Sequence, residues 1–144
     1  MYLPLFINLR GKKVLVVGFG KVGRRRAEKL QKAGALVTII DRHAAGRKRD
    51  VKFIQKTLSP KNIPSLKDYF LVVTATDDKE LNAAIARKAR REGVLINRTD
   101  NFRSGDVIFP AVIETEGKII SFTTLGKSPR LSKKFKEMLE HGLP

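Results

Sequence analysis

The sequence contains no cysteine. That absence excludes disulfides, thiolate nucleophiles and cysteine-ligated zinc or iron–sulfur sites. Long apolar runs are also missing: no stretch approaches the length of a membrane span, and the N-terminal MYLPLFINLRGKK lacks a basic leader and is interrupted by Pro4. The sequence therefore predicts a cytoplasmic protein without a membrane segment, whose fold depends on packing alone.

Acidic residues are scarce relative to basic ones. The chain has 14 Asp and Glu against 30 Lys and Arg, which gives a formal charge of +16. An excess of this sign favours an anionic partner. The basic residues are spread over several segments, form no tail, and are not accompanied by a nucleic-acid motif with stacking aromatics. Nucleic acid is therefore the weaker alternative, in which the charge would serve backbone contacts, and a polycarboxylate or a dinucleotide would be attracted by the same charge.

The order of strand-like and helix-like patterns predicts an α/β fold. A continuous apolar, β-branched run at 12–18 is typical of a buried parallel strand, a second buried strand is predicted at 35–41, and further strands are predicted at 51–56, 69–76 and 94–99. Helical patterns occupy 21–33 and 79–92, and a glycine follows each of them. This order predicts a Rossmann-like, doubly wound parallel sheet over residues 1–104, the expected nucleotide-binding domain.

A different pattern begins after residue 104. Apolar segments at 107–114 and 118–124 flank a short turn that contains Gly117, which predicts an antiparallel β-hairpin. Residues 128–141 predict a terminal helix with Ser128 as its N-cap and an apolar stripe along one face. We therefore expect residues 105–144 to form an appendage rather than another strand–helix unit.

Three glycines follow the first predicted strand in the spacing G-x-G-x-x-G: Gly18, Gly20 and Gly23. The first permits the sharp turn, the second lets the backbone approach a pyrophosphate, and the third lets helix and strand pack closely. Asp41 ends the second strand 18 residues after Gly23 (41 minus 23), where a carboxylate accepts hydrogen bonds from an adenosine ribose. The alternative is that the glycines only form a turn and that Asp41 only ends a strand. The combined context favours a dinucleotide site with its pyrophosphate at the helix N-terminus.

Asp41 also bears on which dinucleotide binds. Its carboxylate would repel a 2′-phosphate and so favours NAD over NADP, whereas the neighbouring Arg42 acts in the opposite sense. The arginines at 24–26 point in different directions on a helix, so they cannot all face the phosphates. The predicted cofactor-binding residues are Gly18, Phe19, Gly20, Lys21, Val22, Gly23, Asp41, Arg42, Thr76 and Asp77.

Polar segments follow the fourth and fifth predicted strands, at the edge of the sheet where ligands bind in this fold class. Thr76 and Asp77 are expected near the nicotinamide, and Asp77 or Asp78 is equally expected to cap the following helix. Asp100 is a candidate general acid or base, the alternative being a solvated turn residue. Its neighbours can bind carboxylates, and four are predicted to bind the substrate: Asn97, Arg98, Asn101 and Arg103.

The chain closely resembles the precorrin-2 dehydrogenase family, which includes the N-terminal module of siroheme synthases. The segments that carry the resemblance are, in order, LPLFINLRGKKVLVVGFGKVGRRRAEKLQKAGALVTII, VVTATDDKELNAAIA, INRTD, FPAVI and TTLGKSPRLSKKFKEML. They cover nearly the whole chain. Their combination is far more specific than the glycine loop alone.

The resemblance implies oxidation of precorrin-2 to sirohydrochlorin with NAD as the hydride acceptor, on the route to siroheme. It implies that Asp100 accepts a proton as hydride leaves the macrocycle and, in bifunctional members, relays pyrrole protons when iron is inserted. It also implies a homodimer to which the hairpin at 107–124 contributes. An anionic tetrapyrrole agrees with the charge of +16.

Two alternatives remain open at this level. Family members usually continue past the final helix whereas this chain stops at Pro144, so we expect a dehydrogenase and leave metal chelation open. No resident metal site is expected, because His43 falls on the adenosine side and His141 in the terminal helix. The alternative function is a regulatory domain that senses NAD(H) without catalysis, against which the antiparallel hairpin argues.

Overall fold

The computed structural model of the chain describes residues 2–125 and 128–142. The chain divides into two compact units, Met1–Val107 and Ile108–Pro144, and each is described by itself. The sequence places the domain boundary after residue 104. Whether each unit is an independent domain stays a prediction.

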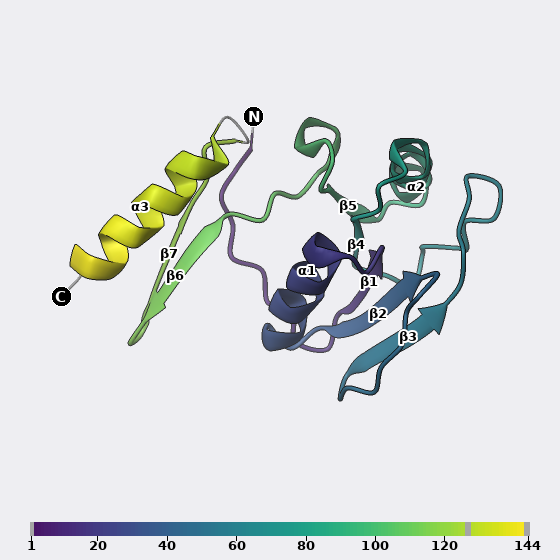
Figure 1. Cartoon of the computed structure of the whole chain (residues 1–144), viewed down its shortest axis with the longest axis horizontal. Helices are drawn as coiled ribbons and strands as arrows, with labels where there is room; N and C mark the ends of the chain where they lie inside the picture. The colour runs from purple at the N-terminus through teal and green to yellow at the C-terminus, as the bar shows by residue number, and fades with distance from the viewer. Residues whose placement is uncertain (1, 126–127, 143–144) are drawn as a thin grey trace. The chain divides into compact units, whose positions relative to one another are not determined.

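One parallel sheet of five strands forms the centre of the first unit (Figure 1). Its strands are β1 (Lys13–Val17), β2 (Leu36–Asp41), β3 (Val51–Gln55), β4 (Leu71–Thr74) and β5 (Leu95–Arg98). Their order across the sheet is β3-β2-β1-β4-β5, so the chain starts in the middle, builds to one edge and then returns to build the other. This is the Rossmann-like order, and it confirms the predicted fold class.

The two helices of this unit are α1 (Lys21–Lys32) and α2 (Lys79–Arg91). Leu15 and Val17 of β1 belong to the same buried cluster as Ile85 of α2. Because side chains alternate along a strand, Val14 and Val16 point to the opposite face of the sheet. There α1, which packs on β1, β2 and β4, buries Ala27 and Leu30. The uninterrupted apolar sequence of β1 thus reflects burial on both faces.

The connection from β3 to β4 has no helix. Residues 56–70 run as turns and extended chain, as the two prolines in this segment favour. Leu66 is fully buried in the cluster beneath α2, and Leu58, Ile63 and Tyr69 pack against that cluster. A loop therefore covers part of the sheet where a helix lies in regular repeats of this fold.

The second unit consists of β6 (Ala111–Thr115), β7 (Lys118–Phe122) and α3 (Pro129–Gly142). The strands pair antiparallel, with Gly117 in the turn at φ 70°. The hydroxyl of Ser128 accepts from the N–H of Leu131 at 3.1 Å, which confirms its predicted role as N-cap. Phe122 of β7 and Phe135 of α3 meet edge to face, with ring centroids 6.1 Å apart.

The first hairpin strand begins later than predicted. The sequence places it at 107–114, whereas β6 starts at Ala111. Pro110 has no N–H to donate to a ladder, and the N–H of Val107 donates instead to the carbonyl of Ile96 at 3.1 Å. Val107 consequently belongs to the first unit, and residues 108–110 precede the hairpin without being part of its ladder.

Candidate active site

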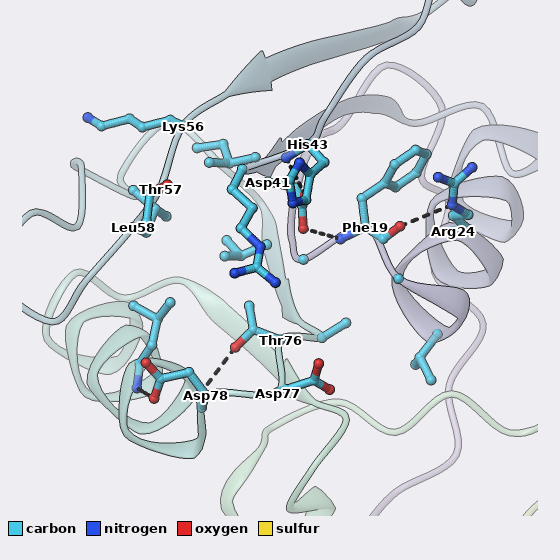
Figure 2. Close-up of a pocket in the computed structure, with 18 of the residues that line it drawn as sticks. Phe19, Arg24, Asp41, His43, Lys56, Thr57, Leu58, Thr76, Asp77 and Asp78 are labelled. Atoms are coloured by element: carbon cyan, nitrogen blue, oxygen red, sulfur yellow. Dashed lines mark hydrogen bonds between the residues drawn. The ribbon is translucent and has the colours of Figure 1, made fainter.

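A cleft of about 730 Å³ lies at the carboxyl ends of β1, β2 and β4. In Figure 2, Phe19 and Asp41 line one side, Thr76, Asp77 and Asp78 line another, and Lys56 and Leu58 border the cleft farther along. Every predicted cofactor-binding residue except Gly23 lines this cleft. Sequence reasoning missed the segment 56–58, which carries no motif and is signalled only by its place after a strand.

The three glycines of the loop meet different surroundings. At Gly18, φ is 95° and an added Cβ would lie 2.5 Å from the carbonyl oxygen of Ala75. A Cβ at Gly23 would overlap the carbonyl oxygen of Gly18. A Cβ at Gly20, in contrast, would meet no protein atom within 4 Å. Gly18 and Gly23 are therefore required by packing, whereas Gly20 keeps open a space beside the backbone.

That space adjoins the N-terminus of α1. Gly20 is the N-cap, no side chain caps the helix, and its first turn has no acidic residue. The first N–H groups of a helix lack partners within the helix, and the helix dipole places partial positive charge there. An open backbone surface with these donors fits the pyrophosphate of a dinucleotide.

Asp41 joins the glycine loop to the end of β2. One carboxylate oxygen, Oδ2, accepts from the N–H of Phe19 at 2.9 Å, and Oδ1 accepts from the N–H of His43 at 2.7 Å. Each carboxylate oxygen has a second lone pair, so the group can also accept from ribose hydroxyls. The two backbone contacts hold the carboxylate beside the cleft (Figure 2).

Arg24 supports the loop rather than extending freely into the cleft. Its Nε donates to the carbonyl of Phe19 at 3.0 Å, and its guanidinium lies 4.4 Å from the centroid of the Phe19 ring. Phe19 in turn contacts Phe53 edge to face. Burial lowers the pKa of Arg26 to about 10, with a further contribution from the charge of Arg25. The three arginines accordingly have different environments, as their helical spacing predicts.

Asp100 follows β5 and is held by Arg98. Arg98 Nε donates to Asp100 Oδ1 at 3.1 Å and Arg98 Nη2 donates to Oδ2 at 2.6 Å. Both side chains are largely buried, with 10% and 15% of Arg98 and Asp100 exposed. Burial raises the pKa of Asp100, but the hydrogen bonds and charge around the carboxylate, chiefly those of Arg98, together outweigh that effect and lower the pKa below its usual value. Asp100 is thus a carboxylate able to accept a proton.

Asn82 is a buried amide that holds Thr76 at the edge of the cleft. Its Nδ2 donates to the carbonyl of Thr76, and the Thr76 hydroxyl donates to Asn82 Oδ1 at 2.7 Å. The prediction of site residues omitted Asn82. Its signal was an amide on the buried face of α2, otherwise formed by residues such as Leu81 and Ile85.

The other predicted substrate ligands lie in different environments. Asn97 is 3% exposed and its Nδ2 donates to the carbonyl of Val107 at 2.7 Å. The guanidinium of Arg98 forms an ion pair with Asp100. Asn101 is exposed, and the guanidinium of Arg103, in the short helix η1 (Phe102–Ser104), lies 5.8 Å from the centroid of the Phe102 ring. Their contacts with a substrate stay predictions.

Two features are missing from the described residues. No group of three His, Cys, Asp or Glu side chains is placed there to hold a metal ion. Likewise, in residues 2–125 and 128–142, no helix is both long enough and apolar enough to cross a membrane.

The fold and the cleft define a dinucleotide-binding protein. Residues 5–111 match the family described as "Putative NAD(P)-binding", and the chain belongs to this family. Because the family is defined by NAD(P) binding, the match confirms a nicotinamide dinucleotide as the cofactor.

The relatives are enzymes of siroheme formation. The chain is 36% identical to siroheme synthase 1 of Pectobacterium atrosepticum and 33% identical to the siroheme synthase of Photorhabdus laumondii, over 99% of its own length. It spans only 30% and 31% of those two proteins. The solved structure of SirC, a precorrin-2 dehydrogenase, matches 100% of this chain and 72% of its own, at 25% identity and a TM-score of 0.81. These findings confirm the resemblance seen in the sequence.

Proposed function

We propose that the protein is an NAD-dependent dehydrogenase that oxidises precorrin-2 to sirohydrochlorin, and that it acts in the cytoplasm. The observation that carries the proposal is the match of the entire chain, including the second unit, to the precorrin-2 dehydrogenase SirC with a TM-score of 0.81. Many proteins share the nucleotide-binding half of this fold. A match that also includes the hairpin and α3 is far more restrictive.

The cleft residues suit NAD. The open backbone at Gly20 and the N-terminus of α1 would hold the pyrophosphate, and Asp41 would accept the ribose hydroxyls. A 2′-phosphate would meet the Asp41 carboxylate, which is held in place by two backbone N–H groups. This fixed negative charge supports NAD over NADP.

The proposed reaction removes two electrons and two protons from the macrocycle. When NAD is bound, its nicotinamide supplies the acceptor for the hydride, which carries both electrons and one proton. The second proton leaves to the Asp100 carboxylate. Because Arg98 keeps this carboxylate ionised, it is ready to accept that proton at neutral pH.

The substrate is a polycarboxylate, which agrees with the net charge of +16. Arg103 and Asn101 are exposed in the segment after Asp100, so they are the predicted ligands best placed to meet substrate carboxylates. Asn97 and Arg98 would act indirectly: Asn97 would hold Val107 in place, and Arg98 would hold Asp100 in place.

The proposed assembly is a homodimer formed through the second unit. Large apolar side chains are exposed there, on β7 and along α3: Ile119, Leu131, Phe135 and Met138. Such a concentration of apolar surface on a hairpin and helix is typical of an interface. A second copy of the chain is the occupant we propose.

The test is anaerobic mixing of the protein with NAD and precorrin-2. We expect NADH to form in a one-to-one ratio with sirohydrochlorin, recorded by absorption at the wavelengths of each product. Tight NAD binding without turnover would contradict the dehydrogenase and favour a domain that senses NAD(H). Binding and turnover with NADP alone would contradict the role of Asp41.

A further inference from the structure

Phe19 is the residue between the first two glycines of the loop, and side chains bind both of its backbone polar groups. Its N–H donates to Asp41 Oδ2 at 2.9 Å, and its carbonyl accepts from Arg24 Nε at 3.0 Å (Figure 2). Because glycine adopts many backbone conformations, a loop built on glycines has little preference for one shape. The two side chains, one from the end of β2 and one from α1, therefore help to decide how the backbone of this loop is oriented.

The bond from Arg24 also sets the direction of the next N–H group. A trans peptide is planar, and its C=O and N–H point in opposite directions. The carbonyl of Phe19 points at Arg24, so the N–H of Gly20, which belongs to the same peptide, points away from Arg24. Gly20 lines the cleft and has open space where a Cβ would lie. The N–H of Gly20 is thus a donor of fixed direction at the N-terminus of α1.

The bond to Asp41 acts in the same way on the preceding peptide. Because the N–H of Phe19 points at Asp41, the carbonyl of Gly18 points the opposite way. This carbonyl lies against α1, where an added Cβ at Gly23 would overlap its oxygen. Rotation of the peptide would break the bond to Asp41 and move the oxygen out of its place beside Gly23. Both peptides of Phe19 are thus fixed in direction.

The ring of Phe19 provides a third restraint. The guanidinium of Arg24 lies 4.4 Å from the ring centroid, and Phe53 of β3 meets the ring edge to face with the centroids 5.5 Å apart. A cation near an aromatic ring and an edge-to-face aromatic pair are both attractive contacts. Arg24 therefore holds Phe19 through the backbone and through the ring.

We propose that Asp41 and Arg24 are positioning residues for the dinucleotide. Together they form a clamp on Phe19 that sets the glycine loop in the shape that receives the pyrophosphate. The inference rests on the proposed function, which places the pyrophosphate at the N-terminus of α1 and the ribose at Asp41. Asp41 then serves two parts of the dinucleotide, the ribose through its remaining lone pairs and the pyrophosphate through Phe19. A loop that is already in its binding shape costs less to order, so loss of the clamp should weaken binding.

The test compares two ligands on the variant Asp41→Ala. ADP carries a diphosphate and the ribose hydroxyls, whereas 2′,3′-dideoxy-ADP lacks both hydroxyls that Asp41 would bind. If Asp41 also acts through Phe19, Asp41→Ala should weaken the binding of 2′,3′-dideoxy-ADP at least about fivefold by calorimetry. Loss of a negative charge by itself favours an anion, so electrostatics alone predicts the opposite change. An unchanged or higher affinity would restrict Asp41 to the ribose and overturn the proposal.

Asp68→Ala is the matched control for this measurement. Asp68 is exposed and does not line the dinucleotide cleft. This variant should bind both ligands as the unaltered protein does. Should Asp41→Ala fail to fold, Arg24→Ala carries the same test, because it removes the other half of the clamp and should also weaken the binding of 2′,3′-dideoxy-ADP.

Hydrogen exchange of the free protein tests the clamp without a ligand. By NMR, the Phe19 amide should exchange at least about tenfold faster in Asp41→Ala, which removes its acceptor. It should exchange at least about threefold faster in Arg24→Ala, although that variant removes no bond to the amide. Arg25→Ala removes the same charge from an exposed position of α1 and should exchange as the unaltered protein does.

A Phe19 amide whose exchange ignores Arg24→Ala would show that the two side chains do not act together, and would overturn the clamp. Neither the ligand titrations nor the exchange measurements use precorrin-2. Failure of the unaltered protein to form NADH would therefore contradict the proposed dehydrogenase separately from the clamp.

Discussion

Asp100 is the residue on which the proposed chemistry depends. Asp100→Asn keeps the size of the side chain but removes the proton acceptor, so we expect turnover to fall at least about a hundredfold. The dissociation constant for NAD should change little, because Asp100 does not line the dinucleotide cleft. Steady-state kinetics and NAD titration measure the two effects. Full activity in this variant would remove Asp100 from the mechanism.

The Arg98–Asp100 pair also predicts that the stability of the fold depends on pH. Burial raises the pKa of Asp100, but the hydrogen bonds and charge around it, chiefly those of Arg98, together lower it to below its ordinary value of 3.8. A depressed pKa stabilises the fold above the pKa of the unfolded state, and that stability is lost as pH falls through the folded pKa. The excess stability over Asp100→Asn should therefore be constant above about pH 5 and shrink below about pH 4. Chemical denaturation across this range measures it; an excess that shrinks already near neutral pH would contradict the lowered pKa.

Gly20 and Gly23 should respond differently to the same substitution. Gly20→Ala places a methyl group in the open space proposed for the pyrophosphate, so NAD affinity should fall at least about tenfold with little change in melting temperature. Gly23→Ala forces a methyl group onto the carbonyl of Gly18 and should destabilise the fold by about 1–3 kcal/mol or more. Calorimetry of binding and thermal melts separates the two. Equal losses of stability in the two variants would contradict the different roles of Gly20 and Gly23.

At the scale of elements, α2 begins at Asp78. The sequence allows either Asp77 or Asp78 as the cap, and the structure selects Asp78, whose side chain accepts from the N–H of Leu81. Asp78→Ala should therefore cost about 1 kcal/mol of folding free energy and lower the melting temperature by about 2–4 °C. Asp77→Ala is the matched comparison and should melt as the unaltered protein does. A reversed order would place the cap at Asp77.

At the scale of the whole molecule, the proposed dimer depends on the second unit. Ile119 of β7 is 55% exposed, and a lysine there would have to be buried in the proposed interface. Ile119→Lys should raise the dimer dissociation constant at least about tenfold, as measured by light scattering after size-exclusion chromatography. Leu36→Lys, at an exposed apolar position of the first unit, should remain dimeric. A monomeric unaltered protein would exclude the dimer.

Much of the fold could be predicted because its signals are local. The apolar run of β1, the glycine spacing at 18–23 and the N-cap at Ser128 each depend on residues that are near one another in sequence. Alternating strands and helices then leave few ways to build a sheet. Where a local rule was overlooked the prediction was wrong: the strand expected from Val107 starts at Ala111, after a proline that cannot donate.

The sequence by itself therefore determined the class of fold, the dinucleotide loop and the candidate carboxylate Asp100. Only the tertiary structure decided which residues line the cleft and which residues hold them. The amide of Asn82 bonds to Thr76 at the cleft edge while α2 packs on β4 and β5, and residues 56–58 reach the cleft because β3 lies beside β2. Such contacts join residues distant in sequence, and they depend on strand order and side-chain direction, which no local pattern encodes.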